Sequence, residues 1–233
     1  MTKWQVEQVF LDCQERLGWQ LRHLQARNRE WEKAKQPQKT AQANQSRSER
    51  AFTYVFLAGV LEDLFRSLDT DLPQDLNQVT VMRHNLRPQA MALLVPQAWD
   101  SISSDRVIRL AKRSALIETA NNFYQPQTPI DFSQMQHLGI TDGRTVNTQH
   151  FEALWDGLCL DISGGSIWES PLHRQAIQTL ASKRNTIAHF ETDPRVEAFR
   201  SSYGELAILT ERITAVATRL QEHLVLWLDK HKI

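Results

Sequence analysis

An arginine and a histidine stand five positions apart near the end of a strongly helical run, in the segment KRNTIAHF at residues 183–190. Histidine ordinarily titrates near neutral pH, so an imidazole can accept or donate a proton during a reaction. The planar fork of an arginine suits a phosphate whose charge increases in the transition state. Arg184 and His189 are therefore candidates for acid–base chemistry at a phosphodiester. Asn185 lies between them and either orients the site or caps a neighbouring backbone group.

Arg184 also has an unusual place on its helix. At about 100° per residue, residues 172–190 form one apolar stripe with Arg184 near its middle, and Asn185 and His189 lie on a polar edge beside it. The stripe consists of Ala176, Ile177, Leu180, Ala181, Ile187 and Ala188. A guanidinium that faces an apolar seam is costly unless it is paired or used. We therefore expect a functional role here, or an ion pair with a buried carboxylate such as Glu62 or Asp63.

The spacing of the two residues raises a geometric difficulty. Residues five apart on an ideal helix point about 140° apart, so Arg184 and His189 of one chain do not converge easily on one substrate. Either the helix distorts near His189, or two chains each contribute groups to a shared cleft. A structural alternative for His189 is a histidine placed favourably at the negative end of the helix dipole.

Composition narrows the class of protein. The 233 residues carry 27 basic and 27 acidic side chains, so any nucleic-acid contact must come from a local patch. The two cysteines fit a reducing compartment without a disulfide framework. The N-terminus lacks the apolar core of a signal peptide, and no stretch is long and apolar enough for a membrane span. We expect a soluble cytoplasmic protein without a membrane contact.

Helical periodicity is strong along most of the chain and predicts an all-α fold, a bundle of about four long helices with shorter inserted helices. The long helices are expected at residues 3–35, 46–69, 172–190 and 203–230. The second is apolar over much of its wheel and is expected to be the central, most buried helix. Residues 36–48 are polar, rich in glutamine and contain Pro37, which predicts a turn or frayed connection.

The region between the second helix and the motif helix is less regular. Its predicted parts are an irregular stretch at 70–90, a short helix at 91–101, a helix at 106–123, a long loop at 125–147 and a helix at 148–160. Ser170 and Pro171 suit the N-cap and first position of the motif helix. Asp193-Pro194 is expected to end or bend the chain that follows. We expect one helical domain over residues 1–233, with 70–147 as an insertion or irregular region.

The segment Arg184-Asn185-x-x-x-His189, on the helix before one last long helix, resembles the Arg-x4-His motif of the HEPN superfamily. The sequence GVLEDLF at residues 59–65 looks like the acidic and apolar signature on the second helix of several HEPN families. The sequence VNTQHF at residues 146–151, which leads to Leu158 and Asp161, looks like the short element before the motif helix. The pattern is most similar to larger HEPN nuclease-like families of bacterial conflict and toxin–antitoxin systems.

The resemblance implies a homodimer in which two motif helices face each other and cleave RNA without a metal or other cofactor. The histidine would take a proton from the ribose 2′-OH or give one to the leaving 5′-oxygen, while the arginine stabilises the phosphate. The expected products are a 2′,3′-cyclic phosphate and a 5′-OH, and DNA, which lacks the 2′-OH, should not be cut. The chain would be a hydrolase-type nuclease that acts as a toxin or defence effector, with an antitoxin protein as a partner.

Several other residues have a plain alternative beside the functional one. Glu62 could belong to the site or pair with Arg66 one turn further on. A basic stripe could contact RNA or be a solvated helix face; it consists of Arg106, Arg109, Lys112 and Arg113. Trp155 and Trp168 could stack on bases or pack in the core. The histidines show no metal-ligand spacing.

One position departs from the family pattern. In HEPN toxins paired with a nucleotidyltransferase antitoxin, a tyrosine commonly follows two positions after the motif histidine, and here that position is Glu191. Control by modification of that tyrosine is therefore not expected. The alternative to an active nuclease is a HEPN-like module without cleavage activity that binds a partner protein, a nucleotide or RNA.

Overall fold

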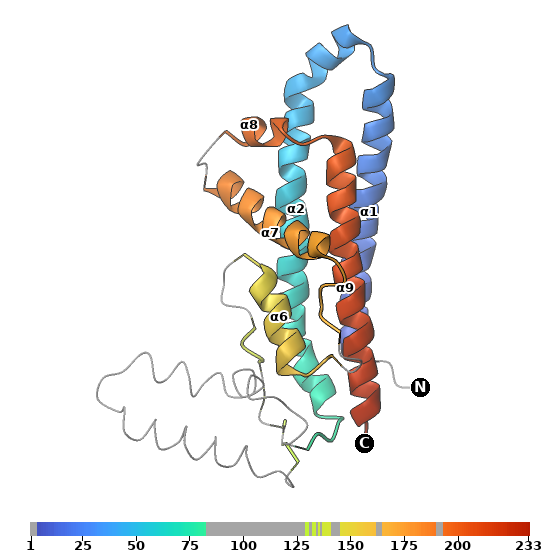
Figure 1. Cartoon of the computed structure of the whole chain (residues 1–233), viewed down its shortest axis with the longest axis vertical. Helices are drawn as coiled ribbons and strands as arrows, with labels where there is room; N and C mark the ends of the chain where they lie inside the picture. Colours follow the sequence, from blue (N-terminus) through green and yellow to red (C-terminus); the bar gives the residue numbers. More distant parts are fainter. Residues whose placement is uncertain are drawn as a thin grey trace, which may run out of the picture.

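Three long helices run side by side through the described part of the chain: α1 (Gln5–Lys33), α2 (Gln36–Leu76) and α9 (Tyr203–His231) (Figure 1). The computed structural model describes residues 4–82, 129–130, 132–133, 135, 137–140, 145–161, 165–189 and 193–233. Within these ranges every regular element is an α-helix, apart from two isolated β-bridges. The all-α class predicted from the periodicity is confirmed.

Three shorter helices complete the described fold: α6 (Thr148–Gly157), α7 (Pro171–Ala188) and α8 (Pro194–Phe199). In Figure 1, α7 crosses α2 obliquely, and its C-terminal end extends beyond the bundle. The helix expected at 148–160 corresponds to α6, which Asn147 caps by accepting a hydrogen bond from the Gln149 N–H at 2.9 Å. α8 was not predicted as a helix. Asp193 caps it by accepting from the Arg195 N–H at 2.8 Å, so Asp193-Pro194 begins a helix here.

The first long helix matches its predicted range closely. Its buried stripe follows the expected spacing of three and four, with Val6, Phe10, Cys13, Leu17 and Leu24 all inside. Cys13 is so well buried that the pKa of its thiol is raised to about 12, although the Arg16 charge acts in the opposite direction. The thiol is therefore an inert core group.

The start of α1 is capped by a carboxylate from the far end of α2. Asp75 accepts the free backbone N–H groups of Gln5 at 3.0 Å and Val6 at 2.9 Å. The side chain is fully buried. Burial raises the pKa of Asp75 above its ordinary value, although the two backbone hydrogen bonds act in the opposite direction. This contact fastens the two ends of the α1–α2 hairpin to each other.

The prediction of a turn or frayed connection at residues 36–48 is wrong, because α2 already begins at Gln36. Pro37 stands in the first turn, where its missing N–H has no helical partner to lose and its fixed φ suits the helix. The glutamines and alanines that follow are good helix formers. The stretch is polar because much of it is exposed.

The irregular stretch expected from residue 70 begins later than predicted, because α2 continues through Pro73 to Leu76. A proline inside a helix removes the hydrogen bond to the carbonyl four residues earlier, here that of Asp69. Leu138 supplies the missing donor, with its N–H 3.3 Å from that carbonyl oxygen. The Asp69 side chain also accepts the Ile140 N–H at 3.0 Å. A segment about seventy residues further along the chain therefore makes the interior proline tolerable.

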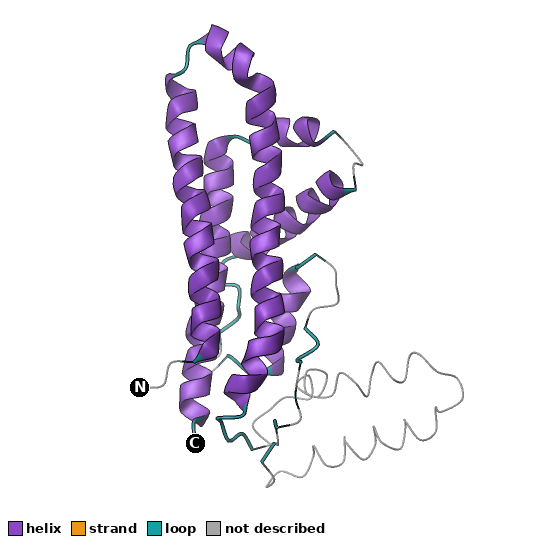
Figure 2. Cartoon of the chain, turned by 180° about the vertical axis from the view of Figure 1, so that it is seen from behind, coloured by secondary structure: helices purple, strands orange, loops and turns teal. Residues whose placement is uncertain are grey.

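The prediction that the second helix is the most central one is confirmed. α2 contacts α1, α7, α8 and α9. Its buried side chains occupy most of its circumference between residues 51 and 76. One face remains open, and it starts at the exposed side chains of Phe52 and Val55. Seen from behind, α1 and α2 lie in front, and no described helix covers them (Figure 2).

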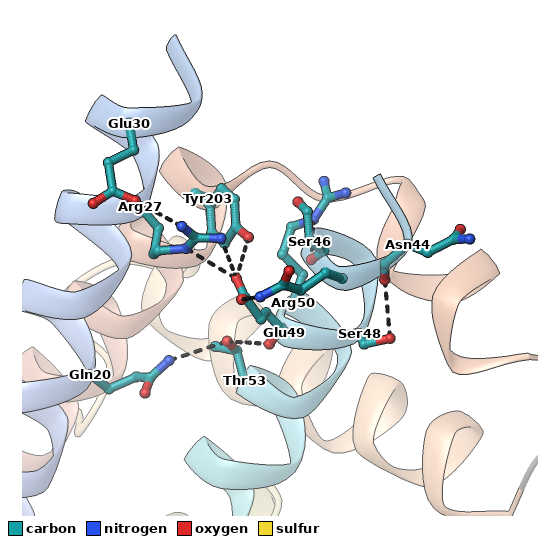
Figure 3. A network of polar contacts seen from close by, with 11 residues as sticks. Gln20, Arg27, Glu30, Asn44, Ser46, Ser48, Glu49, Arg50, Thr53 and Tyr203 are labelled. Carbon is teal, nitrogen blue, oxygen red and sulfur yellow. Dashed lines mark hydrogen bonds and ion pairs between the residues drawn. The ribbon is translucent and has the colours of Figure 1, made fainter. Parts of the chain in front are cut away.

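A network of polar side chains joins α1, α2 and α9 near the hairpin turn (Figure 3). Glu49 of α2 accepts hydrogen bonds from the Arg27 Nε at 3.1 Å, the Arg27 Nη2 at 2.9 Å and the Tyr203 hydroxyl at 2.7 Å. Arg27 also donates to Glu30 at 2.7 Å. Burial alone would raise the pKa of Glu49, but the bonds from Tyr203 and Arg27 hold it below its ordinary value. We call Arg27, Glu49 and Tyr203 the clamp.

The remaining predicted elements are partly outside the described residues. The short helix expected at 91–101 and the helix expected at 106–123 lie entirely outside them. Where residues of the loop predicted at 125–147 are described, they are not helical. Among the described helices, none is long and apolar enough to cross a membrane.

Candidate functional site

The motif helix α7 has well-defined ends. Ser170 caps its start by accepting the Leu172 N–H at 3.2 Å, and Pro171 occupies the first helical position, both as predicted. His189 is the C-cap residue, and its backbone N–H donates to the Asn185 carbonyl at 3.0 Å. The helix is thus regular up to Ala188. No distortion brings His189 round toward Arg184, so the two side chains keep a separation of about 140° around the axis.

The predicted apolar stripe of α7 is buried over most of its length. Its buried members are Ala176, Ile177, Leu180, Ala181 and Ile187. Ala188 was expected to belong to the stripe but is exposed. The reason lies in the arrangement of the helices, because the last turn of α7 extends beyond α2 (Figure 1). The Arg184 side chain lies within the stripe and keeps 27% of its surface exposed.

Arg184 pairs with Glu62 of α2, which is the structural alternative expected for it, an ion pair with a carboxylate such as Glu62 or Asp63. Its Nη2 atom lies 3.2 Å from the Glu62 Oε1, and the Glu62 side chain is 22% exposed. Oε1 itself is buried and accepts no hydrogen bond within the described structure. The contact is therefore an ion pair without hydrogen-bond alignment. Such a contact attracts but leaves the N–H donors of the guanidinium largely unused.

Asp63, the other carboxylate considered, forms its ion pair across to α1 and not to α7. It accepts from Arg16 of α1 at 2.8 Å and from Arg66 at 2.9 Å. Asp63 lies about 100° further round α2 than Glu62 and so faces α1 rather than α7. The alternative pairing of Glu62 with Arg66 is wrong, because Arg66 takes Asp63. The structure thus brings Glu62 and Arg184 together from helices far apart in the sequence.

Asn185 links the motif helix to the segment before α6. Its Oδ1 atom accepts a hydrogen bond from the Thr145 hydroxyl at 2.7 Å and a long one from the Arg184 Nη1 at 3.4 Å. In the described part of the chain, the Asn185 side chain bonds to side chains and not to a backbone group, so the expected capping role is not seen, and the orienting role stays a prediction. Thr145 was not identified from the sequence, and nothing in its local pattern marks it, since its partner is forty positions away.

His189 is exposed at the end of α7. In the described part of the chain, its imidazole has no hydrogen-bond or ion-pair partner, and only its backbone is fixed. An imidazole in that state has both ring nitrogens available for proton transfer. The site therefore combines a held arginine with an accessible histidine on a different side of the same helix end, and Asn185 lies on the same edge as His189.

Of the other candidate residues, the structure describes the two tryptophans but not the basic stripe. Trp155 is buried and donates its indole N–H to the Gly165 carbonyl at 3.3 Å, which is the core-packing alternative. Trp168 is partly buried and donates to Glu152 at 2.9 Å. The basic stripe lies outside the described residues; it consists of Arg106, Arg109, Lys112 and Arg113. In the parts of the chain that are described, no three His, Cys, Asp or Glu side chains are grouped to hold a metal ion.

Comparison with known proteins gives no relative: no family model, no curated protein and no solved structure matches the chain.

Proposed function

We propose that this chain is a metal-independent endoribonuclease of HEPN type that works as a homodimer, as a toxin or defence effector. The observation that carries the proposal is the state of Arg184. It is held at the surface by an ion pair with Glu62 that lacks hydrogen-bond geometry. A purely structural arginine in an apolar stripe is expected to spend its donors on its partner, as Arg27 does. The N–H donors of the Arg184 guanidinium thus remain available to bind a phosphate.

The chemistry follows from the two side chains. The imidazole of His189 removes the proton from a ribose 2′-OH, and the 2′-oxygen attacks the adjacent phosphorus. The bond from phosphorus to the 5′-oxygen breaks, and a protonated imidazole gives a proton to that oxygen. The guanidinium of Arg184 stabilises the charge on the phosphorane oxygens. The products are a 2′,3′-cyclic phosphate and a 5′-OH. Because the 2′-oxygen is the nucleophile, the substrate must carry a 2′-OH. Because the two side chains supply the proton transfer and the charge stabilisation, the reaction needs no metal.

A second copy of the chain resolves the separation of about 140° between the two groups. Phe52, Val55, Gly59 and Glu62 recur at intervals of three and four on α2, so the open face of α2 leads directly to the partner of Arg184. Phe52 is 63% exposed and Val55 is also exposed. A Cβ at Gly59 would meet no atom within 4 Å, so another helix can approach closely there.

The open face of α2 continues onto α1. Trp19 is 55% exposed, and its ring centroid lies 5.8 Å from that of Phe56. Exposed apolar patches of this kind favour protein contacts. In the proposed dimer this face packs on itself about a two-fold axis, with the Glu62 edge of α2 at the border of the interface. We name Trp19, Phe52, Val55 and Phe56 the aromatic face.

The test is cleavage of mixed RNA by purified protein in EDTA, for the wild type, Arg184→Ala and His189→Ala. Arg195→Ala is the matched control, because Arg195 is exposed and, among the described residues, pairs with Asp193 alone. We expect cleavage by the wild type and the control alone, with 2′,3′-cyclic phosphate ends and no cleavage of DNA. Equal cleavage by all four proteins would exclude the proposed site, and EDTA-sensitive cleavage would exclude the proposed mechanism.

The second candidate function is a HEPN-like module without cleavage activity that binds a partner protein, a nucleotide or RNA. The observation that favours it is again the ion pair, because Arg184 and Glu62 also join α7 to α2. In that case Arg184→Ala would lower the free energy of unfolding, and no protein would cleave RNA. Pull-down of an antitoxin protein that binds both wild type and His189→Ala would then identify the partner class.

A further inference from the structure

A cleft of about 280 Å³ lies between α7, the start of α9 and the residues that join α8 to α9. α7 contributes Gln175, Thr179 and Lys183, and the other wall carries Arg200 and Arg212. Gln175 and Thr179 lie about 180° and 140° round α7 from Arg184. The cleft is therefore separate from the contact between Arg184 and Glu62, although both use the same helix.

The charges in the cleft are unbalanced. Lys183 forms an ion pair with Glu197. Glu205, the acidic residue of the lining, accepts from the Ser202 N–H at 2.7 Å and hydroxyl at 3.0 Å, so it is engaged in capping α9. Arg200 and Arg212 make no hydrogen bond or ion pair with any described residue. The lining thus carries two guanidinium groups that make no ion pair with a described residue, against one carboxylate, that of Glu205.

The floor of the cleft adds positive charge rather than removing it. Tyr54 is buried there, and its hydroxyl is 2.7 Å from the Ser201 hydroxyl. Behind it, Arg50 donates to the Ser201 carbonyl. Burial lowers the pKa of Arg50 below its ordinary value, and the nearby Arg47 charge adds to this effect. Arg50 makes no ion pair with a described residue, although the Glu205 charge acts on it, so a third arginine lies behind the cleft.

Of the two cleft arginines, Arg200 is exposed to water, as is Arg29 outside the cleft, and Arg212 is not. Arg29 on α1 is exposed and can be hydrated freely. Arg212 is half-buried in the cleft wall and has less access to water. A group with oxygen acceptors on all sides and a negative charge would satisfy both arginines at once. The amide of Gln175 and the hydroxyl of Thr179 are available as further donors on the opposite wall.

We propose that this cleft binds a phosphate group, carried either by the backbone of single-stranded RNA or by a free nucleotide. Guanidinium forks bind phosphate oxygens in a bidentate way, which a single chloride ion cannot match. The proposal does not require that the chain cleave RNA, since neither Arg184 nor His189 takes part. Its failure and the failure of the nuclease proposal are therefore separate results.

The test uses two probes: a fluorescent 2′-O-methyl RNA oligonucleotide, which cannot be cleaved through its 2′-oxygen, and adenosine diphosphate. Binding is measured by fluorescence anisotropy and by isothermal titration calorimetry, respectively. Arg200→Gln and Arg212→Gln each remove one guanidinium from the cleft, and Arg29→Gln removes the same charge from an exposed position outside it. We expect the two cleft variants to bind about tenfold more weakly and the control to bind like wild type.

A second pair of variants protects the result against effects on folding. Gln175→Glu places a negative charge at an exposed lining position, and Gln178→Glu places the same charge at an exposed position of α7 outside the lining. Gln and Glu have similar helix propensities, so both proteins should fold, and only Gln175→Glu should bind more weakly. Oligonucleotide binding that depends on the cleft identifies a backbone phosphate, and dependence for the diphosphate alone identifies a nucleotide. The proposal is overturned if neither probe binds, or if cleft variants and controls bind alike.

Discussion

The clamp and the motif site each contain an arginine and a glutamate from two helices, yet they use these groups differently. In the clamp, Glu49 accepts three hydrogen bonds at one oxygen and the donors of Arg27 are largely spent. In the motif site, Arg184 and Glu62 lie 3.2 Å apart without a hydrogen bond. A satisfied network holds helices in place, whereas an incompletely satisfied one has capacity for a ligand.

The largest difference between the two regions should appear on replacing His189. We expect His189→Ala to lower RNA cleavage by about 10²–10⁴-fold, the usual contribution of a general acid or base. Because the side chain is exposed and has no described partner, the free energy of unfolding should change by less than about 0.5 kcal/mol. Single-turnover cleavage and urea denaturation of the same preparations measure the two effects. A large loss of stability would instead make His189 a structural cap.

Removing the acid of the clamp should give the opposite result. Glu49→Ala leaves Arg27 and the Tyr203 hydroxyl without their common acceptor, and we expect the free energy of unfolding to fall by about 2 kcal/mol. The cleavage rate per folded molecule should stay unchanged. Urea denaturation gives the first quantity and cleavage at low temperature gives the second. Unchanged stability would show that the clamp is not a structural element.

The two ion pairs can be compared directly by double-mutant cycles. For Arg27 and Glu49 we expect a coupling energy of about 2 kcal/mol, because their hydrogen bonds are aligned and partly buried. For Arg184 and Glu62 we expect about 0.5 kcal/mol, in the range of imperfect, partly exposed pairs. Single and double alanine variants measured in urea give both values. Equal coupling in the two pairs would remove the distinction on which the site assignment rests.

The smallest effect concerns pH. The folded state holds the pKa of Glu49 below its ordinary value of 4.5. The carboxylate therefore contributes stability that is present above pH 4.5 and is lost as the pH falls below it toward the folded pKa. The difference in unfolding free energy between wild type and Glu49→Gln should shrink over that range. A difference that stays constant below pH 4.5 would contradict the lowered pKa.

The pH dependence of Asp75 should have the opposite sign, which separates the two acids. Burial raises the pKa of Asp75 above its ordinary value of 3.8. A raised acid pKa means that the folded state holds the proton more tightly, so stability decreases as the pH rises from 3.8 through the folded pKa. Comparison of wild type with Asp75→Asn over this range measures the effect. A stability gain with rising pH would contradict the dominance of burial.

Much of the fold could be predicted because helical periodicity reports which face is buried. The ranges of α1, α7 and α9 followed from that signal alone. The extent of α2 could not be predicted, because a proline normally ends a helix and the donor that compensates Pro73 comes from Leu138. A contact between segments so far apart in the sequence leaves no local pattern. The clamp was missed for the same reason, since its three members lie on three helices.

The candidate site could be predicted in part. The helical wheel placed Arg184 in an apolar stripe and suggested a buried carboxylate such as Glu62 or Asp63 as a structural partner, and the structure gives Glu62. The choice depended on how α2 is rotated relative to its neighbours, which periodicity does not specify. The hydroxyl of Thr145 on Asn185 was not foreseen, because side-chain bonds between distant segments require the packed fold. The cleft with Arg200 and Arg212 also depends on packing, of α7 against α9.

The central claim is that the Arg184 of one chain and the His189 of its partner share one reaction centre. Mixing inactive Arg184→Ala and inactive His189→Ala chains, after brief unfolding and refolding together, tests it directly. Half of the dimers formed at random are mixed, and each mixed dimer has one complete site out of two, so about a quarter of the wild-type activity should return. If both groups act from the same chain, no dimer has a complete site. The mixture would then remain inactive, which would contradict the account.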